Sequence, residues 1–125
     1  MFLLVLQAYL LLLRFEFYLA RGDFAALYEA IRRTRLEDRK RREEHVARTI
    51  CSAVDLAAIW YWKQVLCLQR SAATVCLLRR FGVPAELVIG AQHMPFRAHA
   101  WVEVEGCVVN DKAYTREIYA VLDRC

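Results

Sequence analysis

Cys67, His99 and Asp111 are residues whose types and order along the chain suit covalent chemistry. A cysteine in the first turn of a helix meets free backbone N–H groups and the positive end of the helix dipole, which stabilise a thiolate. A histidine can take the thiol proton, and a carboxylate can hold the imidazole in the required tautomer. The set predicts attack by Cys67 on a carbonyl carbon, with its own backbone N–H as one donor to the oxyanion.

Cys67 is the one cysteine of the five that lies at an expected helix start. Cys51 and Cys76 fall inside apolar helical segments and are interpreted as small buried hydrophobes, while Cys107 is on an expected strand and Cys125 is the last residue. No CxxC or CxxH spacing indicates a metal site. Nothing marks an oxidising compartment, so reduced thiols in a cytoplasm are expected.

His99 is the preferred base among three histidines because a strand holds an imidazole firmly. His45 lies in a charged run and His93 in an expected loop. Alternation along the strand predicts a packed face of Ala98, Ala100, Val102 and Val104, with His99, Trp101, Glu103 and Glu105 on the other face.

Asp111 and Asn110 compete to orient His99, and the register of a hairpin decides between them. A three-residue loop over 104–106, with Gly106 in the left-handed region, places Asp111 opposite His99. A two-residue loop would bring Asn110 to that side instead. We expect the three-residue loop. Weaker site candidates are Trp62 or Gln64 as the second oxyanion donor, and Trp101 as a partial cover or substrate contact beside His99.

The elements that must position these residues indicate an α+β fold, with a helical N-terminal half followed by a small antiparallel sheet. Asp23 is a candidate N-cap, and Gly82 with Pro84 gives a clear helix stop. The expected helices cover 1–20, 24–34, 38–58 and 67–81, a connection covers 59–66, the strands cover 85–92, 98–104 and 107–111, and a loop covers 93–97. We expect a single domain over 1–125, with a helical subregion at 1–60 and a catalytic core at 61–125.

The composition is strongly apolar, with 58% hydrophobic and 26% charged residues. The net charge of +4 comes from residues 32–48, with eight Lys or Arg and four Asp or Glu. We interpret this run as a solvated helix with pairs such as Glu44–Arg48, rather than a nucleic-acid surface, because no aromatic residues are interleaved. The apolar N-terminal helix packs within its own domain, on a partner or on a membrane, and we rank the membrane last.

Residues 67–111 resemble the transglutaminase-like cysteine peptidases of lasso-peptide biosynthesis. The matching motifs are CLQRS at the helix start, LLRRFGVPA at the helix exit, AHAWVE on the strand, and VVND after it. The resemblance implies a fold similar to transglutaminases and papain-like proteases. It assigns Cys67 as nucleophile, His99 as base and Asp111 as orienting acid, and it implies no cofactor.

The implied function is removal of the leader from a ribosomally made precursor peptide. Some members of the family carry a leader-binding domain, for which 125 residues leave no room. The implied partners are therefore a separate leader-recognition protein and an ATP-dependent lasso cyclase. Two alternatives stay open: a transglutaminase-like acyltransferase, and a non-catalytic adaptor that holds a biosynthetic assembly.

Overall fold

A computed structural model describes residues 2–34, 43–93, 95–112 and 114–125. The helices are α1 (Phe2–Ala20), α2 (Phe24–Arg33), α3 (Glu43–Ile59), α4 (Cys67–Arg80) and α5 (Thr115–Ile118), and the strands are β1 (Ala85–His93), β2 (Phe96–Val104), β3 (Cys107–Val108) and β4 (Ala120–Arg124). The antiparallel sheet has the order β3-β2-β1-β4. The expected α+β class is confirmed.

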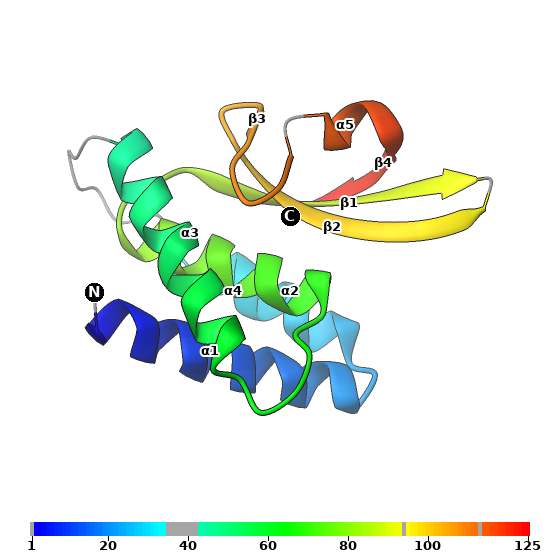
Figure 1. The fold of residues 1–125 in the computed structure, drawn as a ribbon. Helices are drawn as coiled ribbons and strands as arrows, with labels where there is room; N and C mark the ends of the chain where they lie inside the picture. Colours follow the sequence, from blue (N-terminus) through cyan, green and yellow to red (C-terminus); the bar gives the residue numbers. More distant parts are fainter. Residues whose placement is uncertain (1, 35–42, 94, 113) are drawn as a thin grey trace.

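Helix α4 lies at the centre of the core, between α1 and α3 on one side and strands β1 and β2 on the other. Its middle is mostly apolar, and residues 71–78, which include Ser71 and Thr74, are all buried. A helix with no charged face toward solvent must be covered all round, which explains its central position. Helices α1 to α4 lie on one side of the sheet and α5 lies on the other (Figure 1).

The predicted helix boundaries are confirmed where capping residues set them. The Asp23 carboxylate accepts a hydrogen bond from the Ala26 N–H at 3.0 Å and starts α2. Gly82 has a φ of 83° and ends α4 in the left-handed conformation. Helix α3 begins at Glu43; residues 35–42 and the side chain of Glu44 lie outside the described residues, so the Glu44–Arg48 pair stays a prediction.

The β1–β2 connection is shorter than predicted. The expected loop over 93–97 is largely strand, because β1 continues to His93 and β2 begins at Phe96, and these two residues pair. Pro95 lies in the turn and has no N–H of its own that would need a partner there. The two strands therefore form a long arm that projects beyond the helices (Figure 1).

The register predicted for the β2–β3 hairpin is wrong. Val104 pairs with Cys107, so the turn has two residues, Glu105 and Gly106, rather than three. Their φ values of 51° and 80° are those of a type I′ turn, whose twist matches the flanking strands. Pairing also stops at Val108, so the strand predicted over 107–111 is only two residues long.

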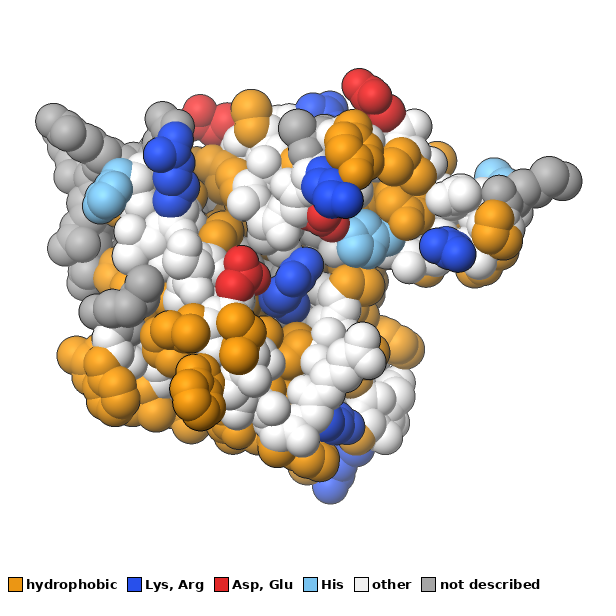
Figure 2. Space-filling model, in the orientation of Figure 1, with side chains coloured by type: hydrophobic (Ala, Val, Ile, Leu, Met, Phe, Trp, Pro, Cys, Tyr) orange, Lys and Arg blue, Asp and Glu red, His pale blue; other side chains and the backbone are white. Residues whose placement is uncertain are grey.

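Helix α1 packs on its own chain through one face only. Ala8, Leu11, Leu12 and Phe15 are buried, whereas Leu3, Leu6, Leu10, Leu13 and Phe17 are exposed. The helix is long and apolar enough to cross a membrane, with 22% of its most apolar window buried. Figure 2 shows hydrophobic side chains gathered over the helical part of the molecule.

Candidate active site

His99 and Asp111 form a direct pair. The His99 Nε2 lies 2.5 Å from the Asp111 Oδ2, and the two side chains are 21% and 22% exposed. The Asp111 Oδ1 accepts a second hydrogen bond from the Lys112 N–H at 2.8 Å. Partial burial alone would raise the pKa of Asp111, but these hydrogen bonds and the nearby Arg70 hold it below its ordinary value.

Asp111 reaches His99 even though the hairpin register differs from the prediction. After β3 ends, the Val109 N–H donates to the Val102 carbonyl, and the Asn110 Oδ1 accepts from the Val102 N–H at 2.8 Å. The Asn110 side chain thus takes the place of a backbone partner, and the chain bends there. Both residues that the sequence offered as alternatives are used: Asn110 bonds to β2 and Asp111 to His99.

Cys67 is the first residue of α4, as predicted. The preceding residue, Leu66, has no side-chain acceptor, and its N–H donates to the Gln69 Oε1 at 3.3 Å. The first backbone bond of the helix runs from the Arg70 N–H to the Leu66 carbonyl. An apolar residue at the cap position cannot bond the N–H groups of the first turn, so they remain available to an anion.

Cys67 and His99 line one small cavity of about 100 Å³, together with Leu68, Ile89, Ala98 and Ala100. Figure 2 shows the recess between the projecting β1–β2 arm and the helices. Because the His99 Nε2 is directed at Asp111, Nδ1 is the ring nitrogen left for a thiol proton.

Tyr119 and Gly90 support His99, and the sequence did not point to either. The ring centroids of Tyr119 and Trp101 lie 5.2 Å and 6.1 Å from that of His99. Gly90 pairs with His99 across β1 and β2. A Cβ at Gly90 would lie 2.6 Å from the Trp101 Cη2 and 2.9 Å from the Tyr119 Cβ, so only glycine leaves room for these rings.

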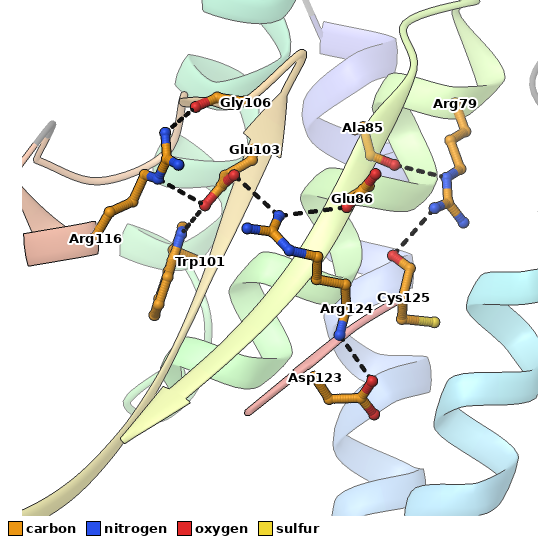
Figure 3. Close-up of polar contacts among 10 residues, drawn as sticks. All are labelled: Arg79, Ala85, Glu86, Trp101, Glu103, Gly106, Arg116, Asp123, Arg124 and Cys125. Atoms are coloured by element: carbon orange, nitrogen blue, oxygen red, sulfur yellow. Dashed lines mark hydrogen bonds and ion pairs between the residues drawn. The ribbon is translucent and has the colours of Figure 1, made fainter. Parts of the chain in front are cut away.

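The prediction that Trp101 and Glu103 lie on the less covered face of β2 is wrong, because both side chains are buried. The Trp101 indole N–H donates to the Glu103 Oε2 at 2.9 Å, and Arg124 donates to the other carboxylate oxygen at 3.1 Å (Figure 3). Arg116 lies 3.6 Å from the same carboxylate. Burial alone would raise the pKa of Glu103, but these donors hold it below its ordinary value.

Trp101 therefore packs beside His99 rather than offering a surface to substrate, since its exposed fraction is 0%. The sequence signals this buried ion pair only weakly. Trp101 and Glu103 alternate on one strand, and Arg116 and Arg124 follow near the end of the sequence. The two remaining candidates, Trp62 and Gln64, are exposed residues in the segment before α4. They are not among the residues that line the Cys67–His99 cavity.

A second cavity of about 220 Å³ lies beside the start of α4. It is lined by Glu16, Leu19, Ala20, Lys63, Leu66 and Gln69. Glu16 pairs with Lys63 and also accepts a hydrogen bond from the Tyr61 hydroxyl. This charged pair was not identified from the sequence, although Lys63 lies between the two candidates Trp62 and Gln64.

The other cysteines and histidines lie outside this constellation. Burial raises the pKa of Cys51 to about 11 and also raises the pKa of Cys76 and Cys125, which keeps these thiols neutral. His45 and His93 are exposed. Within the described parts of the chain, no three His, Cys, Asp or Glu side chains gather as a metal site would require.

The transglutaminase-like superfamily matches residues 9–124, which is nearly the whole chain. The chain belongs to this superfamily. The chain is also 35% identical over 80 residues to the microcin J25-processing protein McjB of Escherichia coli. That alignment covers 64% of this chain and 38% of McjB, so this transglutaminase-like chain spans well under half of its relative. No solved structure matches it.

Proposed function

We propose that this transglutaminase-like protein is a cysteine peptidase that cleaves a peptide bond through Cys67, His99 and Asp111. The observation that carries the proposal is the Asp111-bound imidazole of His99 in one cavity with the helix-start Cys67. A thiol, a base within reach of it and a group that orients the base are what covalent acyl chemistry requires.

In the proposed reaction, His99 Nδ1 takes the proton of the Cys67 thiol and the thiolate attacks the scissile carbonyl. A C–S bond forms, and the imidazolium returns the proton to the amine as the C–N bond breaks. Water, deprotonated by the same imidazole, then releases the acid from the thioester. Asp111 keeps Nε2 protonated throughout and stabilises the imidazolium.

The Cys67 N–H is the proposed first donor to the oxyanion, supported by the uncapped start of α4. The second donor stays a proposal at Trp62 or Gln64. Both lie in the exposed segment that leads into α4.

An extended peptide is the proposed substrate conformation. The Val102 N–H and carbonyl bond away from β1, so those of Ala98, an even number of residues along the strand, face the same outer edge of β2. Ala98 is one of the residues that line the Cys67–His99 cavity, and among the described residues no strand pairs with this outer edge of β2 at Ala98. An exposed strand edge beside a nucleophile is suited to hold a peptide by main-chain hydrogen bonds.

The proposed substrate is the precursor of a ribosomally made lasso peptide, from which the leader is removed in the bacterial cytoplasm. The likeness to a microcin J25-processing protein and the CLQRS, AHAWVE and VVND motifs support this. A separate leader-recognition protein and an ATP-dependent cyclase are the proposed partners, by the same resemblance.

The first test replaces the nucleophile. Cys67→Ala should abolish cleavage of a lasso-peptide precursor, supplied with the leader-recognition protein, because no thiolate remains to attack. Mass spectrometry of the released leader measures the loss, and Cys107→Ser, which changes an exposed thiol in the hairpin, is the matched control. Cleavage that survives in Cys67→Ala would contradict the assignment of Cys67 as nucleophile. A Cys67 thiol that fails to react with a thiol-directed peptide electrophile, while the protein still binds its partners, would favour the adaptor alternative.

The superfamily match favours acyl transfer to an amine as the second candidate. The same thioester would then react with an amine instead of water. Adding a primary amine to the reaction and weighing the product separates the two, since a peptidase gives the free acid and an acyltransferase gives the amide.

A further inference from the structure

We infer that Ser71 and Asn110 are positioning residues that tie the three elements carrying Cys67, His99 and Asp111 into one unit. The inference rests on the proposed function, but the contacts that carry it do not. Ser71 belongs to the CLQRS motif and Asn110 to the VVND motif. Both are polar, and the proposed mechanism gives neither of them a role.

A chain of hydrogen bonds joins the two residues to β2. The Ser71 hydroxyl donates to the Ala100 carbonyl at 3.1 Å and accepts from the Asn110 Nδ2 at 3.0 Å. The Asn110 Oδ1 accepts from the Val102 N–H at 2.8 Å. Ser71 is fully buried, so these bonds are made away from water, where a lost partner is costly.

Each end of this chain lies next to a residue of the proposed triad. Ser71 is one helical turn after Cys67 and faces the same way along α4. Ala100 follows His99 directly in β2, and Asn110 precedes Asp111. The bonds therefore fix the helix start against the strand, and the strand against the segment after β3.

The residue types suit this task. Serine at position 71 offers a donor and an acceptor on a side chain small enough for helix and strand to approach closely. Asparagine at position 110 offers both an acceptor for the Val102 N–H and a donor for Ser71, and neither aspartate nor leucine offers both. Because pairing of β3 ends at Val108, the segment that carries Asp111 is attached to β2 by the bond from the Val109 N–H to the Val102 carbonyl and, next to Asp111, by the Asn110 side chain.

The test measures the reactivity of the Cys67 thiol without any substrate. Purified full-length variants are treated briefly with iodoacetamide, and mass spectrometry of peptides gives the ratio of Cys67 to Cys107 alkylation. Cys107 is exposed in the hairpin turn region and serves as the internal reference. Ser71→Ala and Asn110→Ala should each lower this ratio about tenfold or more, since misplacing the thiol by about an ångström relative to His99 hinders the proposed proton transfer severely.

Thr74→Val is the matched control for stability alone. Thr74 is buried in the same helix, but among the described residues its hydroxyl bonds to the Arg70 carbonyl of α4 alone, so its loss weakens the helix without touching β2. The Cys67 ratio should stay within about twofold in Thr74→Val at a comparable loss of stability. Ser71→Thr, which keeps the hydroxyl, should retain more reactivity than Ser71→Ala.

In the cleavage assay the same two variants should lower kcat by a similar factor with KM nearly unchanged, because the groups moved act on the reacting bond. An alkylation ratio in Ser71→Ala equal to that in Thr74→Val would overturn the inference and leave Ser71 a packing residue. If instead Cys67→Ala still cleaves precursor while the ratio falls in Ser71→Ala and Asn110→Ala, the proposed function fails and the positioning role stands.

Discussion

Asp111 is held by two N–H donors, and its lowered pKa makes its contribution to stability depend on pH. A carboxyl group whose pKa is depressed on folding stabilises the native state above its ordinary pKa of about 3.9, and this stability is lost as the pH falls through the lower folded value. We therefore expect Asp111→Asn to cost on the order of 1 kcal/mol at pH 6 and less at pH 3, which lies below the ordinary pKa of the carboxyl group. Urea unfolding of both proteins at the two pH values measures the difference. An equal cost at both would mean that the charge of Asp111 contributes nothing.

The residues of the candidate site were largely predictable one at a time. Cys67 follows from a strong helix signal, and His99 from a strand long enough to show alternation. Asp111 was chosen through a register that the structure contradicts, and it lies beside His99 because the strand ends early and the Asn110 side chain bonds to Val102. Sequence spacing cannot show where ladder pairing stops, since that depends on side-chain bonds made across the fold.

Gly90 of β1 leaves the space that the aromatic rings beside His99 of β2 occupy. A Cβ at this position would lie within 3 Å of the Trp101 and Tyr119 side chains on the face that supports His99. We expect Gly90→Ala to destabilise the protein by about 1–3 kcal/mol, because the rings must shift in a packed site. Chemical denaturation measures the cost.

Repeating Gly90→Ala in a Trp101→Phe protein tests whether the indole ring is what excludes a side chain at position 90. Trp101→Phe removes the two indole atoms nearest to the added Cβ, so Gly90→Ala should cost less in that background, although the Tyr119 contact remains. Equal costs in the two backgrounds would show that the indole is not what excludes a side chain at Gly90.

Burial on the outer face of β2 was not predictable from the strand alone. Alternation identifies two faces but does not say what covers each of them. Here α5 and β4 come from residues after 114, which have no clear period, and they supply Tyr119, Arg116 and Arg124. The helices were more predictable, because Asp23, Gly82 and the apolar run of α4 act locally.

Arg79 connects parts of the molecule that are far apart in sequence. Its guanidinium donates to the carbonyls of Ile31, Ala85 and Cys125 at 2.9 to 3.1 Å, and two of these bonds are drawn in Figure 3. It thus joins the end of α2, the start of β1 and Cys125, whose backbone is hydrogen-bonded to that of Leu87 in β1.

Arg79→Met should therefore lower the free energy of unfolding by about 2–3 kcal/mol, since carbonyls away from bulk water lose a charged donor. Arg80→Met, one residue along the same helix, should change it by no more than about 0.5 kcal/mol. Thermal or urea unfolding compares the pair. Similar losses for both variants would mean that the side-chain length, not these bonds, stabilises the helix end.

The three tryptophans of the chain differ sharply in their exposure. Trp60 and Trp62 are 74% and 66% exposed, whereas Trp101 is sealed between Glu103 and the His99 ring. A quencher dissolved in the buffer reaches the first two indoles and not the third. The fluorescence that survives added iodide or acrylamide thus comes from Trp101, which gives the candidate site a built-in optical reporter that needs neither label nor substrate.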